Sequence, residues 1–79
     1  MQNLLHFLLK EITGNENFSI EEKEEDGALT LQVVAETEDM GIIIGKGGKT
    51  IKALQELLRV RGKIENKPVF INVIEKGSQ

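Results

Sequence analysis

Hydrophobic and polar positions along the chain follow two periods, which together predict an order of helices and strands. Residues 4–12 carry apolar side chains at helical spacing, and Gly14 ends this predicted helix. Apolar and polar positions then alternate over 18–20 and 29–35, on either side of the turn residues Glu25-Asp26-Gly27. This pattern predicts a β-hairpin with one buried face.

The second half of the chain changes period in the opposite order. Residues 38–44 are compatible with a short helix after Thr37 as N-cap. Residues 49–61 place their apolar side chains on one half of a longer helix, which Gly62 closes. Alternation over 69–73 predicts a last strand. The predicted order is therefore α-β-β-α-α-β.

This order predicts one α+β domain with a three-stranded mixed sheet and its helices on one face. We expect the first two strands to pair antiparallel, and the last to lie parallel to the second across the helical crossover. No repeat or linker divides the 79 residues, so the domain is expected over 1–76 with a disordered tail at 77–79. The predicted core includes Phe7, Phe18, Ile51, Leu54 and Leu58, whereas Val34 and Phe70 are expected on the open sheet face.

Composition argues against catalysis, cofactors and membranes. The chain has no cysteine and a single histidine, His6, which falls on a polar helix face and is expected to be solvated. No nucleophile–base pair or metal cluster can be assembled from such a set, so we expect neither an enzyme nor a cofactor. The apolar stretch near the N-terminus is interrupted by charges and is about half a membrane span. A cytoplasmic protein is the default expectation.

The net charge of −3 hides an asymmetry between the two halves of the chain. Residues 1–40 hold two lysines against ten acidic residues, a net charge of −8, whereas residues 41–79 hold eight basic residues against three acidic ones, a net charge of +5. Such a division indicates one surface that faces a polyanion, although a run of acids in a hairpin is also common as simple solvation.

Glycines and lysines gather between the two predicted helices of the second half, within 43–51. A turn without Cβ atoms lets backbone N–H groups approach an anion, and the following helix adds the positive end of its dipole. A nucleotide-triphosphate loop would need glycine where Ile43 stands, and a dinucleotide loop would need glycine at Thr50. What remains is the Gly-x-x-Gly turn between two helices that clamps a nucleic-acid backbone.

The sequence from Ile43 to Leu54 resembles the KH signature, and the order of elements resembles the type II, prokaryotic arrangement. Size, the opening Leu-Leu-x-Phe-Leu-Leu helix and residues 38–41 make the chain most similar to small bacterial KH proteins of the KhpA family. That family's loop commonly carries Gln and then Arg where this chain has Gly47 and Lys49, which keeps charge but loses bidentate phosphate geometry.

The resemblance implies a single-stranded RNA site in which Lys46 and Lys49 act as point charges on the backbone, with about four bases between the short helices and the last strand. Lys52, Arg59, Lys63 and Lys67 would widen the basic surface, although solvation is the commoner role for such residues. The RNA-binding residues expected on this basis are Met40, Ile43, Ile44, Gly45, Lys46, Gly47, Gly48, Lys49, Thr50 and Lys52.

The same resemblance implies an RNA chaperone that acts as a homodimer or with a KhpB/Jag-type partner in gene regulation, cell shape and cell wall homeostasis. A different class of function stays open at this point. The chain is also compatible with an assembly subunit that docks another protein, for example on a ribosomal particle, with an idle RNA site.

Overall fold

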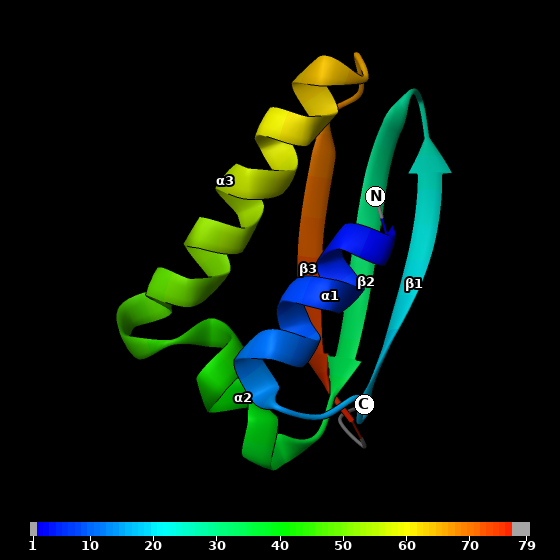
Figure 1. Cartoon of the computed structure of the whole chain (residues 1–79). Helices are drawn as coiled ribbons and strands as arrows, with labels where there is room; N and C mark the ends of the chain where they lie inside the picture. Colours follow the sequence, from blue (N-terminus) through cyan, green and yellow to red (C-terminus); the bar gives the residue numbers. More distant parts are fainter. Residues whose placement is uncertain (1, 77–79) are drawn as a thin grey trace.

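The computed structural model describes residues 2–76 and has the predicted order of elements (Figure 1). The predicted tail at 77–79 lies outside the described residues. A one-turn 3₁₀ segment, η1, joins the second and third helices. The elements are α1 (Gln2–Thr13), β1 (Phe18–Glu25), β2 (Ala28–Ala35), α2 (Thr37–Ile44), η1 (Lys46–Gly48), α3 (Lys49–Ile64) and β3 (Val69–Glu75).

The sheet has the predicted mixed topology, with strand order β1-β2-β3. β1 and β2 pair antiparallel in register from Phe18 opposite Ala35, and β2 and β3 pair parallel from Leu29 opposite Val69. The hairpin closes through Asp26 and Gly27, whose φ angles of 51° and 79° match the right-handed twist of the paired strands. All three helices lie on one face of the sheet (Figure 1), which confirms the predicted α+β class.

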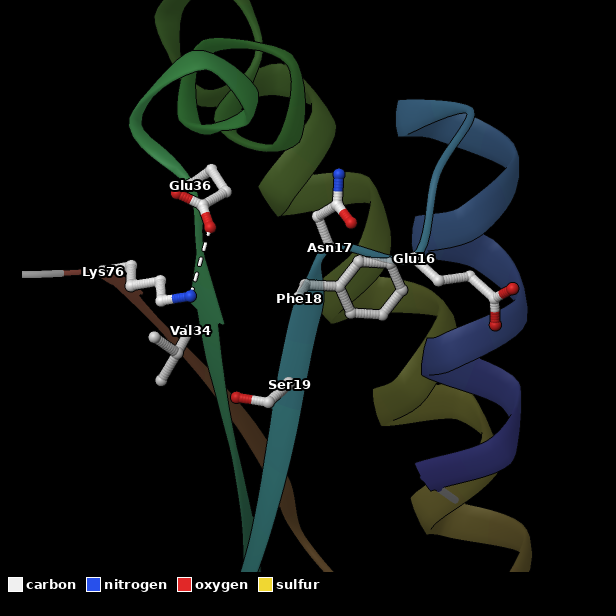
Figure 2. Close-up of a pocket in the computed structure, with 7 residues that line it drawn as sticks. All are labelled: Glu16, Asn17, Phe18, Ser19, Val34, Glu36 and Lys76. Carbon is white, nitrogen blue, oxygen red and sulfur yellow. Dashed lines mark ion pairs between the residues drawn. The ribbon is translucent and has the colours of Figure 1, made fainter.

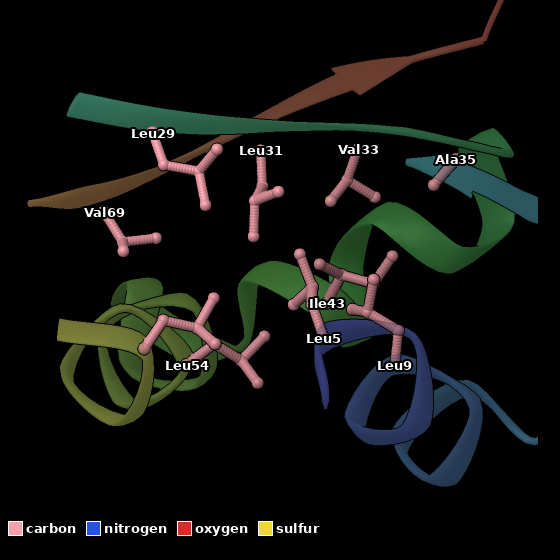
Figure 3. Packing of buried hydrophobic residues seen from close by; sticks show 10 residues of the cluster. Leu5, Leu9, Leu29, Leu31, Val33, Ala35, Ile43, Leu54 and Val69 are labelled. Atoms are coloured by element: carbon pink, nitrogen blue, oxygen red, sulfur yellow. The ribbon is translucent and has the colours of Figure 1, made fainter. Parts of the chain in front are cut away.

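The core lies between that face and the helices (Figure 3). Every second residue of β2 is buried, as its alternating sequence predicts. The predicted core residues Leu54 and Leu58 are buried, and Ile51 and Phe18 are half-buried and pack against the core cluster. The buried apolar side chains are Leu5, Leu9, Leu29, Leu31, Val33, Ala35, Ile43, Leu54, Leu58 and Val69.

Two predicted helix boundaries are wrong. Gly62 does not close α3, which continues to Ile64. A Cβ at Gly62 would collide with the Lys67 carbonyl oxygen and lie 2.8 Å from Val69 Cγ2, so this glycine lets the returning chain pass close to the helix. Thr37 is not the N-cap of α2 but its first residue, and no side chain caps this helix from the N-cap position.

The predicted position of Phe7 is also wrong, because its side chain is 57% exposed. Leu57 and Val60 lie on the apolar half of α3 but are 53% and 56% exposed, so the apolar half is wider than the surface that the sheet covers. Phe70 is exposed and Val34 half-buried on the open sheet face, as predicted. Among the described helices, none is long and apolar enough to span a bilayer.

Candidate nucleic-acid interface

The connection from α2 to α3 depends on glycine at its first position. Gly45 has φ 79° and ψ 168°, a region that side chains strongly disfavour. A Cβ there would collide with Thr50 Oγ1 and lie 2.8 Å from the Thr50 amide nitrogen. The Gly45 amide donates to the Gly41 carbonyl at 2.8 Å, and the Gly48 amide donates to the Gly45 carbonyl at 3.0 Å. The result is a tight turn that brings Gly45 against the start of α3.

The start of α3 is open to an anion. Gly48, in the N-cap position, has left-handed backbone and supplies no side-chain hydrogen bond, and the first turn contains no acidic residue. The helix has 16 residues, so its N-terminal N–H groups present the positive end of a full dipole. Lys46 precedes this end and Lys49 is its first residue, both with exposed side chains. This arrangement suits a phosphate group.

Ion pairing separates the cations near this site from those elsewhere. Five basic residues form ion pairs with acids: Lys10 with Glu16, Arg59 with Glu56, Arg61 with Glu65, Lys67 with Glu24 and Lys76 with Glu36. In contrast, Lys46, Lys49 and Lys52 have no ion pair with any residue of the described range. Lys23 and Lys63 likewise form no ion pair within the described range. Lys63 lies on α3, as Lys49 and Lys52 do, whereas Lys23 lies on β1. The unpaired positive charge is thus concentrated on the loop and one helix.

The apolar residues before the loop are only partly available as a surface. Met40 is half-buried and Ile44 is 37% exposed, so each has an accessible side-chain portion. Ile43 is fully buried in the core, so the prediction that it contacts bases is wrong. It supports α2 from beneath, whereas its neighbour Ile42, which sequence reasoning did not select, is 47% exposed. Helical rotation of about 100° per residue explains why adjacent isoleucines differ so strongly.

Gln55 is a second residue that sequence reasoning missed, because it falls on the polar half of α3, where a solvated side chain is expected. Its side-chain Nε2 donates to the Val69 carbonyl at 2.7 Å, and its Oε1 accepts from the Ile71 amide at 3.0 Å. Both partners belong to β3, an edge strand of the sheet. The contact joins α3 to the strand, and no local spacing signal distinguishes it from a solvated glutamine.

Two clefts lie away from the glycine loop. A cleft of about 280 Å³ is lined by Glu16 and Phe18 on one side and by Glu36 and Lys76, which form an ion pair, on the other (Figure 2). Its carboxylates disfavour a polyanion. A second cleft of about 340 Å³ at the far end of α3 is lined by Arg59, Lys63 and Lys67. Arg59 and Lys67 are paired with Glu56 and Glu24, so the expected widening of the basic surface by these residues stays a prediction.

Two further titratable side chains, His6 and Asp39, make contacts within the fold. His6 remains partly solvated, with 45% of its side chain exposed, its ring 5.1 Å from that of Phe18 and its Nε2 3.3 Å from Glu16. Asp39 is buried and accepts from the Asn15 side chain at 3.4 Å. Across residues 2–76, no group of three His, Asp or Glu side chains is placed to hold a metal ion.

A mixed three-stranded sheet with the order α-β-β-α-α-β, together with a Gly-Lys-Gly-Gly turn between two helices, defines a type II KH domain. KH domains are nucleic-acid recognition modules rather than enzymes. The sequence matches the family described as KhpA/KhpB, KH domain, over residues 2–73, and the chain belongs to this family.

Individual relatives agree with this assignment. RNA-binding protein KhpA of Listeria monocytogenes is 32% identical over 76 residues, which cover 95% of this chain and all of the relative. RNA-binding protein KhpA of Thermotoga maritima is 39% identical over 59 residues, or 73% of this chain and 79% of the relative. A crystal structure of an Aquifex aeolicus Era variant bound to GDP·AlF₄⁻ aligns with TM-score 0.51 and 20% identity over 90% of this chain and 31% of that chain, a likeness of fold alone.

Proposed function

We propose that this chain binds single-stranded RNA and holds the sugar-phosphate backbone at the glycine loop and the start of α3. The observation that carries the proposal is the uncapped, acid-free N-terminus of α3 beside the unpaired Lys46 and Lys49. Membership of the KhpA/KhpB family and relatives named RNA-binding protein KhpA support it. We expect this activity in the cytoplasm.

The proposed mechanism divides positioning from base contact. Backbone N–H groups at the loop and lysine side chains neutralise phosphates, which fixes the register of the strand without reading its sequence. Met40 and Ile44 would offer apolar surface to bases, and Gly47, Gly48, Thr50 and Lys52 would contribute to the same site from the loop and the first turn of α3. Because no aromatic side chain belongs to this set, base discrimination should be modest.

Binding should be tested by fluorescence anisotropy of short single-stranded RNAs against wild type and the double variant Lys46→Asp, Gly47→Asp. Gly47 has φ 64° with open space around its Cα, so aspartate fits its left-handed backbone. We expect affinity to fall at least tenfold while circular dichroism stays unchanged.

A charge-matched control is Lys23→Asp with Gly14→Asp. Lys23 forms no ion pair within the described range, and Gly14 also has positive φ, 75°, with open space. The control should bind RNA within about twofold of wild type. Equal losses in both double variants would indicate a net-charge effect, and unchanged binding in the loop variant would refute the proposed site.

A second candidate function rests on a different surface, the exposed apolar stripe formed by Ala53, Leu57, Val60 and Ile64. These residues recur at spacings of four, three and four on α3, and the last three are 53%, 56% and 76% exposed. Such a stripe suits helix-to-helix association. It favours association, either as a homodimer or with a KhpB/Jag-type partner. It is equally compatible with the alternative function, a docking subunit with an idle RNA site.

The finer physiological role follows the family resemblance. We propose an RNA chaperone that acts with such a partner in regulation of gene expression, cell shape and cell wall homeostasis. Sedimentation of Leu57→Asp against wild type tests the association. A dimeric wild type and a monomeric variant would support the stripe as the dimer interface. A monomeric wild type would mean that the stripe contacts a different protein rather than a second copy of this chain.

A further inference from the structure

The outer edge of β3 presents hydrogen-bonding groups in a fixed alternation. The Leu29 amide donates to the Pro68 carbonyl and the Lys76 amide to the Ala35 carbonyl, both at the β2 side. In a parallel pair, alternate residues direct both backbone groups toward the neighbouring strand. Even-numbered residues of β3 therefore direct their backbone N–H and C=O groups toward β2. Odd-numbered residues, such as Val69, Ile71 and Val73, direct these groups toward the open edge of the sheet.

The Gln55 carboxamide occupies part of this edge as a residue of an added strand would. In a parallel sheet, one residue donates its N–H to a carbonyl and accepts from the N–H two residues further along. Gln55 does the same with the Val69 carbonyl at 2.7 Å and the Ile71 amide at 3.0 Å. Only its NH₂ group can donate and only its oxygen can accept, so these partners fix the orientation of the amide.

We propose that Gln55 sets the register of RNA bases along β3 by filling its first edge position, so that base contact begins at the Ile71 carbonyl and the Val73 amide. This inference rests on the proposed RNA binding. A nucleobase edge carries an adjacent donor and acceptor, as a carboxamide does, so the two compete for the same pair of backbone groups.

The surroundings favour a nucleic acid over a peptide strand as the ligand of this edge. Lys52 precedes Gln55 by about one helical turn and has no ion pair with residues of the described range, so unneutralised positive charge lies beside the edge. α3 and β3 lie close together at the short connection between them, and the distance between them grows toward the glycine loop (Figure 1). The open part of the β3 edge therefore lies on the side of the proposed phosphate contacts.

The test is an NMR titration of ¹⁵N-labelled wild type and Gln55→Ala with random-sequence pentanucleotide RNA. In wild type the Val73 amide should shift on binding and the Ile71 amide should not, because Gln55 already holds it. In Gln55→Ala the Ile71 amide should exchange faster without RNA and shift with it, and the pentanucleotide should bind about three- to tenfold tighter.

Controls separate this inference from its premise. Gln32→Ala, in the central strand, should reproduce the wild-type shifts, and Gln55→Met keeps the side-chain length if alanine impairs folding. Loop amides that shift while Ile71 stays unchanged in both Gln55 variants would overturn the register role alone. Loop amides that fail to shift in wild type would refute RNA binding at the loop. Dimerisation of Gln55→Ala without RNA, measured by sedimentation, would instead identify Gln55 as a guard against strand pairing and overturn the proposal.

Discussion

The two helices that flank the glycine loop begin in opposite ways. α2 has Glu38 and Asp39 in its first turn, and Asp39 is buried with its carboxylate accepting from Asn15 at 3.4 Å. α3 has no acid in its first turn, no side-chain cap, and lysine at its first position. Both helices lie on the same face of the sheet, and they are joined by Gly45 and the three residues of η1.

The two helices thus differ in whether acidic side chains of the protein compensate the positive end of the helix dipole. The positive end of the α2 dipole is compensated by its own carboxylates, a favourable arrangement for stability. The corresponding end of α3 is surrounded by further positive charge, which is unfavourable for an isolated helix. A bound anion would remove that cost, which supports the proposed phosphate contact at the start of α3.

The largest expected effect is that of Gly45→Ala at the α3 entrance. Alanine there must adopt an unfavourable backbone region and meet Thr50, so the free energy of unfolding should fall by about 2–3 kcal/mol. RNA affinity should fall at least tenfold because the turn changes shape. Urea denaturation and anisotropy check the two effects, and a fully stable variant would contradict the close approach of Gly45 to Thr50.

The second largest effect is expected in the salt dependence of RNA binding. If two phosphates are neutralised, log K should fall against log salt with a slope of about −1.4 for a single strand. Lys46→Ala should make the slope shallower by about 0.7, whereas Lys10→Ala, whose partner Glu16 lies 3.6 Å away, should leave it unchanged. Equal slopes for wild type and Lys46→Ala would remove this lysine from the phosphate contact.

Gly41→Ala, inside α2, should have the opposite sign to the change at Gly45. Gly41 is helical and nothing lies within 4 Å of the position its Cβ would take. Alanine should therefore raise the free energy of unfolding by about 0.5–1 kcal/mol through helix propensity and leave RNA affinity unchanged. Thermal and urea denaturation measure the gain, and destabilisation would show that the α2 backbone is under a constraint absent from its contacts.

The smallest expected effect is that of Glu38→Gln at the start of α2. Loss of this exposed carboxylate from the first turn should lower the free energy of unfolding by about 0.3–1 kcal/mol at low salt, and less at high salt. RNA binding should stay within about twofold. A strong gain in RNA affinity would mean that the start of α2, and not only that of α3, faces the RNA.

Local patterns were sufficient to predict the order of elements, the hairpin turn and most of the core. The alternation in β2 and the helical spacing of Leu54 and Leu58 are properties of short segments, so the burial that they predict does not depend on how distant segments pack. Boundaries set by tertiary contact were not predictable in this way. Gly62 has the sequence position of a helix stop, but its real constraint is the chain that returns past it toward Val69.

The candidate site divides along the same line. The glycines and lysines of the loop are adjacent in sequence, so their pattern by itself indicates phosphate binding. Gln55 and Ile71 are 16 residues apart, and their hydrogen bond depends on how α3 lies against β3. Burial of Ile43 beside exposed Ile42 depends on the rotation of α2 about its axis, which its run of three isoleucines leaves undetermined.

The most direct test of the central claim is photo-crosslinking of bound single-stranded RNA with the crosslinked residues mapped by mass spectrometry. We predict crosslinks within residues 40–52, around the loop and the start of α3, and at the β3 edge near Ile71 and Val73, where the bases are proposed to lie. Both sets should be lost in the variant Lys46→Asp, Gly47→Asp. Crosslinks confined to the β1–β2 hairpin or to the apolar stripe of α3, with none in 40–52, would contradict the account.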